Sequence, residues 1–185
     1  MSVFPKPYAD LVARLRVASG FLLVAAFAWF SRPDVASLWV GLPVSALGLL
    51  LRAWASGHLE KNIRLAESGP YAYVRNPLYL GTLWVAGGLV AASQRWLLAG
   101  LFAAVFLLVY LPAIELEEQH LRNLFPGFGA YAELVPALWP TFKPLRSDRP
   151  FRWSLYARNR EYQALLGWLA GAAFLVGKVL VPGIP

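Results

Sequence analysis

The sequence contains no cysteine, so it offers no disulfide bond, no thiolate nucleophile and no cysteine metal site. Charged residues are also scarce, at 15% of the chain against about 25% in soluble domains. The alternation of apolar and polar residues that is typical of half-buried strands is missing, and so is any internal repeat. Hydrophobic residues instead make up 58% of the chain. This balance excludes an ordinary soluble domain and indicates a membrane protein.

Five apolar segments approach the length of about 20 residues that a helix needs to cross the hydrocarbon core. The third and fourth are separated only by Gln94 and Arg95, which predicts a tight helical hairpin. We therefore expect an all-α membrane protein with about five transmembrane helices. The segments cover approximately residues 11–30, 35–56, 78–93, 96–114 and 162–181.

The basic residues are distributed unevenly across this predicted topology. The N-terminal segment and the connections 57–77 and 115–161 together carry 13 lysines and arginines, whereas the opposite side carries only Arg32 and Arg95. Short loops rich in Lys and Arg stay in the cytoplasm, so the N-terminus and both long connections are predicted to be cytoplasmic. The net charge of +7 then indicates contact with anionic lipid headgroups, without a nucleic-acid partner.

A rigid polar motif, GPYAYVRNPLYLG at residues 69–81, stands directly before the third apolar segment. Pro70 and Pro77 fix the backbone, and Gly81 permits close approach by another backbone or a ligand. One interpretation is a stiff interfacial turn with aromatic anchors and a snorkelling arginine. The other is one wall of a binding site, with Arg75 as its charged group.

A second polar cluster consists of Glu115, Glu117 and Glu118, at the end of a helix that we expect to continue to about Leu124. Carboxylates near a helix C-terminus oppose the macrodipole, and they repel one another unless they have partners. A solvated helix end with Glu118 paired to Arg122 is one interpretation. A bound cation is the other. The proline- and aromatic-rich segment 125–140 follows, as an interfacial loop or as a lid over the glutamates.

Taken together, these motifs resemble the isoprenylcysteine carboxyl methyltransferases and the related phospholipid methyltransferases. The resemblance covers about residues 45–142 and rests on the order of two motifs about 40 residues apart. At the position after the arginine the family usually has histidine, and this sequence has Asn76, whose side chain does not titrate. The matching residues are Gly69-Pro70-Tyr71, Arg75-Asn76-Pro77-Leu78-Tyr79-Leu80-Gly81, Glu117-Glu118, Leu121, Phe125, Tyr131 and Pro140.

The resemblance implies a multi-pass protein of the bacterial inner membrane with a cytoplasmic active site. The apolar segments and the resemblance together give the expected organisation: two transmembrane helices in residues 1–56, a catalytic core in 57–142, and, beyond the part that the resemblance covers, a basic interfacial linker with a last transmembrane helix in 143–185. The segments 57–81 and 115–142 would form the cofactor pocket on the cytosolic side.

The family uses S-adenosylmethionine, so the resemblance implies transfer of its methyl group to a lipophilic acceptor from the bilayer. The cofactor carboxylate suits Arg75 or Arg64, and its amino group or ribose suits Glu117 and Glu118. Methyl transfer from a sulfonium requires positioning and no metal. Arg75, Glu118 and Arg52 are the candidate catalytic residues. The candidate cofactor-binding residues are His58, Arg64, Tyr73, Arg75, Asn76, Pro77, Tyr79, Gly81, Glu117, Glu118 and Tyr131.

Some assignments stay open at this point. Arg52 either binds the acceptor headgroup or snorkels to the surface, and snorkelling is the favoured interpretation. A membrane sterol or steroid reductase is the alternative enzyme, with Lys143, Arg146 and Arg149 as binders of an NADPH phosphate. A non-enzymatic membrane protein is a third reading. The acceptor, whether a carboxylate or a lipid headgroup, and the oligomeric state are not specified by the sequence.

Overall fold

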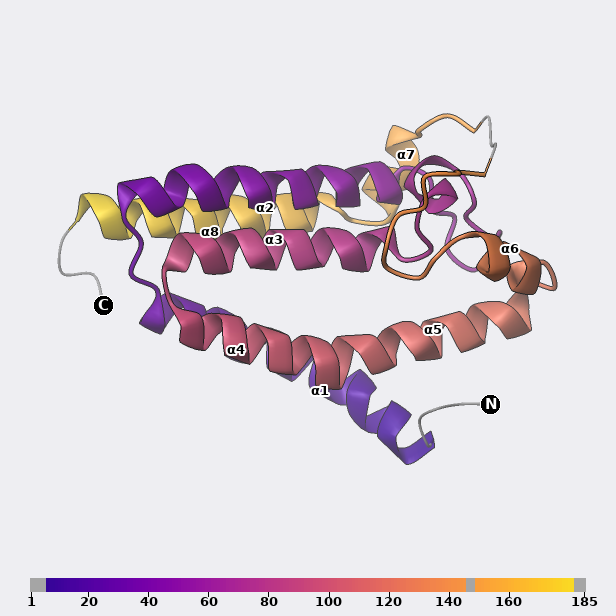
Figure 1. Ribbon diagram of the computed structural model, residues 1–185, viewed down its shortest axis with the longest axis horizontal. Helices are drawn as coiled ribbons and strands as arrows, with labels where there is room; N and C mark the ends of the chain where they lie inside the picture. The colour runs from indigo at the N-terminus through magenta and orange to yellow at the C-terminus, as the bar shows by residue number, and fades with distance from the viewer. Residues whose placement is uncertain (1–5, 146–148, 182–185) are drawn as a thin grey trace.

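The computed structural model describes residues 6–145 and 149–181, and the described chain is helical without strands (Figure 1). This confirms the predicted all-α class. The α-helices are α1 (Lys6–Phe30), α2 (Val35–Ser56), α3 (Pro77–Ser93), α4 (Trp96–Val105), α5 (Leu111–Leu124), α6 (Phe128–Leu134), α7 (Trp153–Arg158) and α8 (Tyr162–Leu180). A 3₁₀ turn, η1 (Gly69–Ala72), and a π-helical turn, η2 (Phe106–Tyr110), complete the elements.

The long helices form two layers. Helices α2, α3 and α8 lie alongside one another, and α1 packs against the continuous helix formed by α4, η2 and α5 (Figure 1). Three helices among the described residues are long and apolar enough to cross a membrane: α2, α8 and the 29-residue helix Trp96–Leu124. Two shorter apolar helices, Ala18–Phe30 and Pro77–Ser93, accompany them.

Helices α2 and α3 pack closely because glycines meet glycines along their contact. A Cβ atom added to Gly41 would lie 2.4 Å from the Gly88 carbonyl oxygen, and one added to Gly48 would lie 2.6 Å from that of Gly81. At such distances a side chain larger than hydrogen would force the two helices to move apart. Small residues at regular spacing permit this close approach in membrane helices, where packing contacts replace the hydrophobic drive. The contact fixes the start of α3 beside the end of α2.

Carbonyl oxygens at the C-terminal end of α1 accept hydrogen bonds from side chains of other elements. The last turn of a helix leaves carbonyls without intrahelical partners, and cations are favourable there. Nζ of Lys178 on α8 donates to the carbonyl oxygens of Ala28 (3.0 Å) and Ser31 (2.8 Å). Arg95 adds a bond from its Nε to the Phe30 carbonyl at 3.2 Å. These contacts tie α1, α8 and the α3–α4 turn together.

A proline explains the π-helical turn η2. Pro112 has no N–H, so it cannot bond the Leu108 carbonyl four residues earlier, and the Leu111 N–H bonds the Phe106 carbonyl five residues back. The Tyr8 hydroxyl on α1 donates to the Leu108 carbonyl at 2.7 Å. The helix therefore continues past its proline with one wide turn.

The two long connections meet at one end of the molecule, as predicted, where α6 and α7 also lie (Figure 1). Backbone bonds join them directly, from Arg75 N to Pro136 O at 2.8 Å and from Thr141 N to Tyr73 O at 2.8 Å. A further bond runs from Arg152 N to Gly57 O at 3.0 Å. The predicted pocket segments are therefore neighbours.

Candidate functional site

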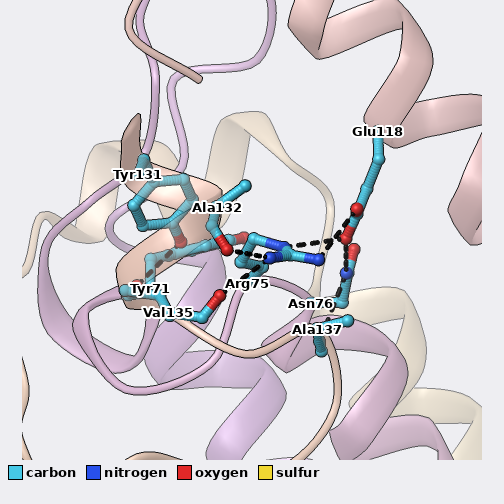
Figure 2. Close-up of polar contacts among 8 residues, drawn as sticks. All are labelled: Tyr71, Arg75, Asn76, Glu118, Tyr131, Ala132, Val135 and Ala137. Carbon is cyan, nitrogen blue, oxygen red and sulfur yellow. Dashed lines mark hydrogen bonds and ion pairs between the residues drawn. The ribbon is translucent and has the colours of Figure 1, made fainter. Parts of the chain in front are cut away.

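Arg75 lies between α5, which carries Glu118, and the C-terminal end of α6, where Ala132 and Val135 lie (Figure 2). Its Nε and Nη2 donate to the two carboxylate oxygens of Glu118, each at 3.0 Å. Its Nη1 donates to the carbonyl oxygens of Ala132 (2.6 Å) and Val135 (2.9 Å). Four of its five N–H groups are thus committed within the protein. We call Arg75, Asn76 and Glu118 with the carbonyls of Ala132, Val135 and Ala137 the arginine clamp.

Asn76 completes the arginine clamp. Its Nδ2 donates to Oε1 of Glu118 at 2.7 Å and to the Ala137 carbonyl at 3.2 Å (Figure 2). Both bonds need a donor and no titration, so an amide suits this position. The alternative pairing of Glu118 with Arg122 is wrong, because Glu118 pairs with Arg75 and the Arg122 guanidinium lies 5.4 Å from the Phe128 ring centre.

A small apolar core holds α6 under the clamp. Phe128, Tyr131 and Val135 are buried there against Leu65 and Leu121. The Tyr131 hydroxyl donates to the Tyr71 carbonyl at 2.8 Å. Burial raises the pKa of both tyrosines far above the ordinary value, so the phenols are held in their neutral form. The segment 125–140 is therefore packed against the polar motif as well as lying near the glutamates.

A cavity of about 780 Å³ lies between the two predicted pocket segments. Its volume falls within the range of about 300–1,000 Å³ common for small-molecule sites. Of the predicted site residues, Arg52, Arg64, Arg75, Asn76, Pro77, Tyr79, Glu117, Glu118 and Tyr131 line it. Other lining residues were not predicted to contact the cofactor, among them Leu59, Lys61, Asn62, Tyr71, Thr82, Tyr110, His120 and Phe128.

Glu117 differs from its neighbour in its surroundings. It is exposed and lines the cavity, and its Oε2 accepts a hydrogen bond from the Tyr79 hydroxyl at 3.0 Å. The Tyr79 ring meets the Tyr110 ring edge-on, with centroids 6.2 Å apart, so α3 and η2 both position this contact. The cavity wall therefore carries a carboxylate held in place by a phenol.

Arg52 reaches the same cavity from α2, and its surroundings correct the favoured interpretation that it snorkels. Its Nε and Nη2 donate to the Glu161 carboxylate at 2.6 and 3.1 Å, and its Nη1 donates to Thr82 Oγ1 at 2.6 Å. Glu161 is buried, with 7% of its side chain exposed. Glu161 was not predicted as a site residue, because its only signal in the sequence is its position directly before the last apolar helix.

Three predicted cofactor-binding residues do not line this cavity. His58 packs against Gly69 and the Phe151 ring, and its Nδ1 lies 3.0 Å from Ser68 Oγ. Partial burial lowers the pKa of His58, which favours its neutral form. Tyr73 faces Trp54, and Gly81 faces Arg52 and Gly48.

A strap, residues 60–67, separates the main cavity from a second cavity of about 440 Å³ that His58 lines. Glu60 forms ion pairs with both Arg64 and Arg152, so it ties the strap to the segment before α7. Arg64 lines both cavities. Of the basic residues named for a reductase, Arg149 lines the second cavity, and Arg146 lies outside the described residues.

Residues 49–127 match the sequence model of the phospholipid methyltransferase family. The cobalt-zinc-cadmium resistance protein CzcN of Cupriavidus metallidurans is 32% identical over 171 residues, which cover 87% of this chain and 77% of that protein. The nickel-cobalt-cadmium resistance protein NccN of Alcaligenes xylosoxydans xylosoxydans is 28% identical over 173 residues, with coverages of 89% and 80%.

No solved structure matches the chain. The family match spans the end of α2, the polar motif, α3 and the helix that carries both glutamates, which are the elements that surround the main cavity. The chain therefore belongs to the family of membrane methyltransferases that includes the phospholipid and isoprenylcysteine carboxyl methyltransferases.

Proposed function

We propose that this protein is an S-adenosylmethionine-dependent methyltransferase of the membrane that acts on a lipophilic acceptor. The observation that carries the proposal is the cavity itself. It brings the Arg75 motif and the Glu117-Glu118 motif together at one end of an apolar helical bundle. Family membership supplies the reaction class, and the cavity supplies a place for a polar cofactor next to the bilayer.

The chemistry of the lining residues fits this cofactor. S-adenosylmethionine supplies an activated methyl group and carries a carboxylate and two positive groups. Lys61 and Arg64 on the strap suit the carboxylate. Glu117 suits a positive group, and Leu65, Leu121 and the Phe128 ring provide apolar surface for an adenine. Arg75 has four N–H groups committed to the clamp, so we assign it chiefly to holding the site together.

The protein's own part in the reaction is to bind and orient the two reactants, because a sulfonium methyl group needs no further activation. The arginine clamp fixes α5 and the segment 132–137 relative to the start of α3. Arg52 and Thr82 lie at the wall that α2 and α3 form, where the cavity adjoins the apolar part of the bundle. We propose that the acceptor's polar group reaches this wall while its apolar part stays in the bilayer.

The test is calorimetry of the purified full chain with S-adenosylmethionine, S-adenosylhomocysteine and NADPH. The proposal requires binding of both sulfur compounds, and binding of NADPH alone would favour the reductase alternative. Transfer of radiolabelled methyl groups to extracted bacterial lipids and to a prenylcysteine analogue then distinguishes headgroup from carboxylate acceptors. Labelling of neither class would contradict a lipophilic acceptor.

The printed names of the two relatives associate those proteins with metal resistance. A role of this chain in metal resistance is a second proposal, which rests on these names. Within residues 6–145 and 149–181, no three His, Cys, Asp or Glu side chains form a group suited to a metal ion. We therefore propose that any such role acts through methyl transfer. A variant without methyltransferase activity that still protects cells from cobalt or zinc would contradict this.

A further inference from the structure

The carboxylates of the two adjacent glutamates of α5 have different neighbours. Successive residues on an α-helix are about 100° apart, so neighbouring side chains leave the helix in different directions. Glu118 belongs to the arginine clamp and is bonded to Arg75 and Asn76, and Glu117 faces the cavity and Tyr79. Both residues line the cavity, but the Glu118 carboxylate is bonded to Arg75 and Asn76, whereas, among the described residues, the Glu117 carboxylate accepts a single bond, from Tyr79.

Glu118 has little capacity left for a ligand. Its Oε1 accepts from Arg75 and Asn76, and its Oε2 accepts from Arg75. The bidentate pair neutralises its charge and ties it to the Arg75 side chain. Loss of this negative charge would weaken the attachment of α5 to the polar motif, so its main effect would be on the stability of the protein.

Glu117 keeps a free oxygen. In the part of the chain that the structure describes, its Oε2 accepts one hydrogen bond, from Tyr79, and its Oε1 accepts none. No ion pair of the described residues involves Glu117. A phenol fixes the orientation of the carboxylate without cancelling its charge. Glu117 therefore places a negative charge on the α5 wall of the cavity.

The other charged residues that line the cavity differ in the same way, because some have ion-pair partners and one has none among the described residues. Arg52, Arg64 and Arg75 are paired with Glu161, Glu60 and Glu118, respectively. Lys61 lines the cavity from the strap, and among the described residues it has no ion-pair partner. The unpaired charges are thus a carboxylate on α5 and an ammonium on the strap, which suits a ligand with charges of both signs.

From this geometry we infer separate tasks for the two glutamates. This inference rests on the proposed function. Glu118 is a positioning residue that holds α5 in the arginine clamp. Glu117, oriented by Tyr79, faces a sulfonium or ammonium group in the cavity and makes the site prefer cationic over neutral ligands. The matched pair of variants Glu117→Gln and Glu118→Gln separates these tasks, because both remove one charge with almost no change of shape.

The experiment compares two ligands of the full-length protein by calorimetry at low ionic strength. S-adenosylhomocysteine has a neutral sulfur, and sinefungin carries an ammonium group near the same position. We expect wild type to bind sinefungin about tenfold more tightly, as a nearby opposite charge favours the charged form. Glu117→Gln should abolish this preference, and Tyr79→Phe should reduce it. Glu118→Gln should keep the preference and lower the thermal unfolding midpoint.

A preference for sinefungin that survives in Glu117→Gln would overturn the inference. So would a Glu118→Gln protein that loses the preference while keeping its unfolding midpoint. Should Glu118→Gln fail to fold, the Glu117→Gln and Tyr79→Phe variants still decide the assignment of Glu117. Failure of wild type to bind either ligand would overturn the proposed function and this inference with it, and that result differs from loss of preference alone.

Discussion

Arg75 bonds two kinds of acceptor at once, a carboxylate on one helix and backbone carbonyls at the end of another. The planar guanidinium permits this because its donors diverge within one plane. The carbonyls of Ala132 and Val135 belong to the end of α6, where backbone oxygens lack intrahelical partners. One side chain thus caps a short helix and neutralises a glutamate, so the site depends on Arg75 before any ligand binds.

The first prediction concerns Tyr131. Tyr131→Phe removes the bond to the Tyr71 carbonyl and should lower the free energy of unfolding by about 1 kcal/mol at neutral pH. Burial raises the folded-state pKa of Tyr131, so its contribution is complete below the unfolded value of about 10 and is lost as pH rises through the folded value. Wild type should therefore lose stability above about pH 10 more steeply than Tyr131→Phe.

Chemical denaturation in detergent between neutral and strongly alkaline pH measures this difference. Tyr73→Phe is the matched control, because Tyr73 is 40% exposed and should change neither the neutral stability nor its alkaline slope. Equal slopes for wild type and Tyr131→Phe would contradict the assignment of the burial effect to this phenol.

For individual residues, the sequence predicted which side chains belong to the site better than it predicted their hydrogen-bond partners. Arg75, Glu117 and Glu118 carry motif signals, and the structure brings them to one cavity. Their hydrogen bonds were not predictable, because the Ala132 and Val135 carbonyls have no side-chain signature. Glu161 was missed for a similar reason, since its partner Arg52 lies 109 positions earlier and no local pattern links them.

At the scale of elements, hydrophobic length predicted the long helices closely. The second segment has the predicted bounds, and the helix carrying the glutamates ends at Leu124 as expected. The short elements η1, α6 and α7 were not predicted, because helices of one or two turns are stabilised by contacts such as the Phe128–Tyr131–Val135 core.

The second prediction tests the α2–α3 contact with two neighbouring glycines of α3. Gly88→Ala should lower the free energy of unfolding by about 1–3 kcal/mol, because the new methyl group would lie 2.4 Å from the Ser45 nitrogen. Gly87→Ala meets nothing within 4 Å and should be neutral or stabilising by up to about 1 kcal/mol through helix propensity. Thermal unfolding of the two variants in the same detergent compares them, and equal destabilisation would contradict the close packing.

At the scale of the whole molecule, one ion pair joins the C-terminal helix to the cavity wall. Glu161 precedes α8, and its partner Arg52 lies on α2 beside Thr82 of α3. Breaking a buried pair leaves an uncompensated charge, whereas removing both members does not. The C-terminal segment therefore belongs to the site as well as to the bundle.

The third prediction follows from this pair. Glu161→Gln should lower the free energy of unfolding by about 3 kcal/mol, and adding Arg52→Leu to it should restore part of that loss. Unfolding of the wild type, the two single variants and the double variant forms a double-mutant cycle that measures the coupling. Additive losses would show that the two side chains act independently.

The fourth prediction concerns orientation in the membrane and uses the absence of cysteine, which makes any introduced cysteine unique. Lys143 and Arg32 are both exposed and lie in connections predicted to face opposite sides. In intact bacterial cells with a permeabilised outer membrane, a membrane-impermeant maleimide should label Arg32→Cys and leave Lys143→Cys unlabelled. Inverted membrane vesicles should give the reverse pattern. Labelling of both cysteine variants from the same side of the membrane would contradict the topology derived from the basic residues.

The wide turn at η2 also sets the direction in which the later side chains of this helix point around its axis. A π-helical turn contains one residue more than an α-helical turn, so everything after it is rotated by about 100° relative to an uninterrupted helix. Tyr110 ends this turn, and Glu117 and Glu118 follow it. Without that offset, the two carboxylates would point in other directions around the helix axis. In the helix 96–124, Pro112 therefore maintains the rotational offset that directs Glu118 toward Arg75 and Glu117 toward the cavity.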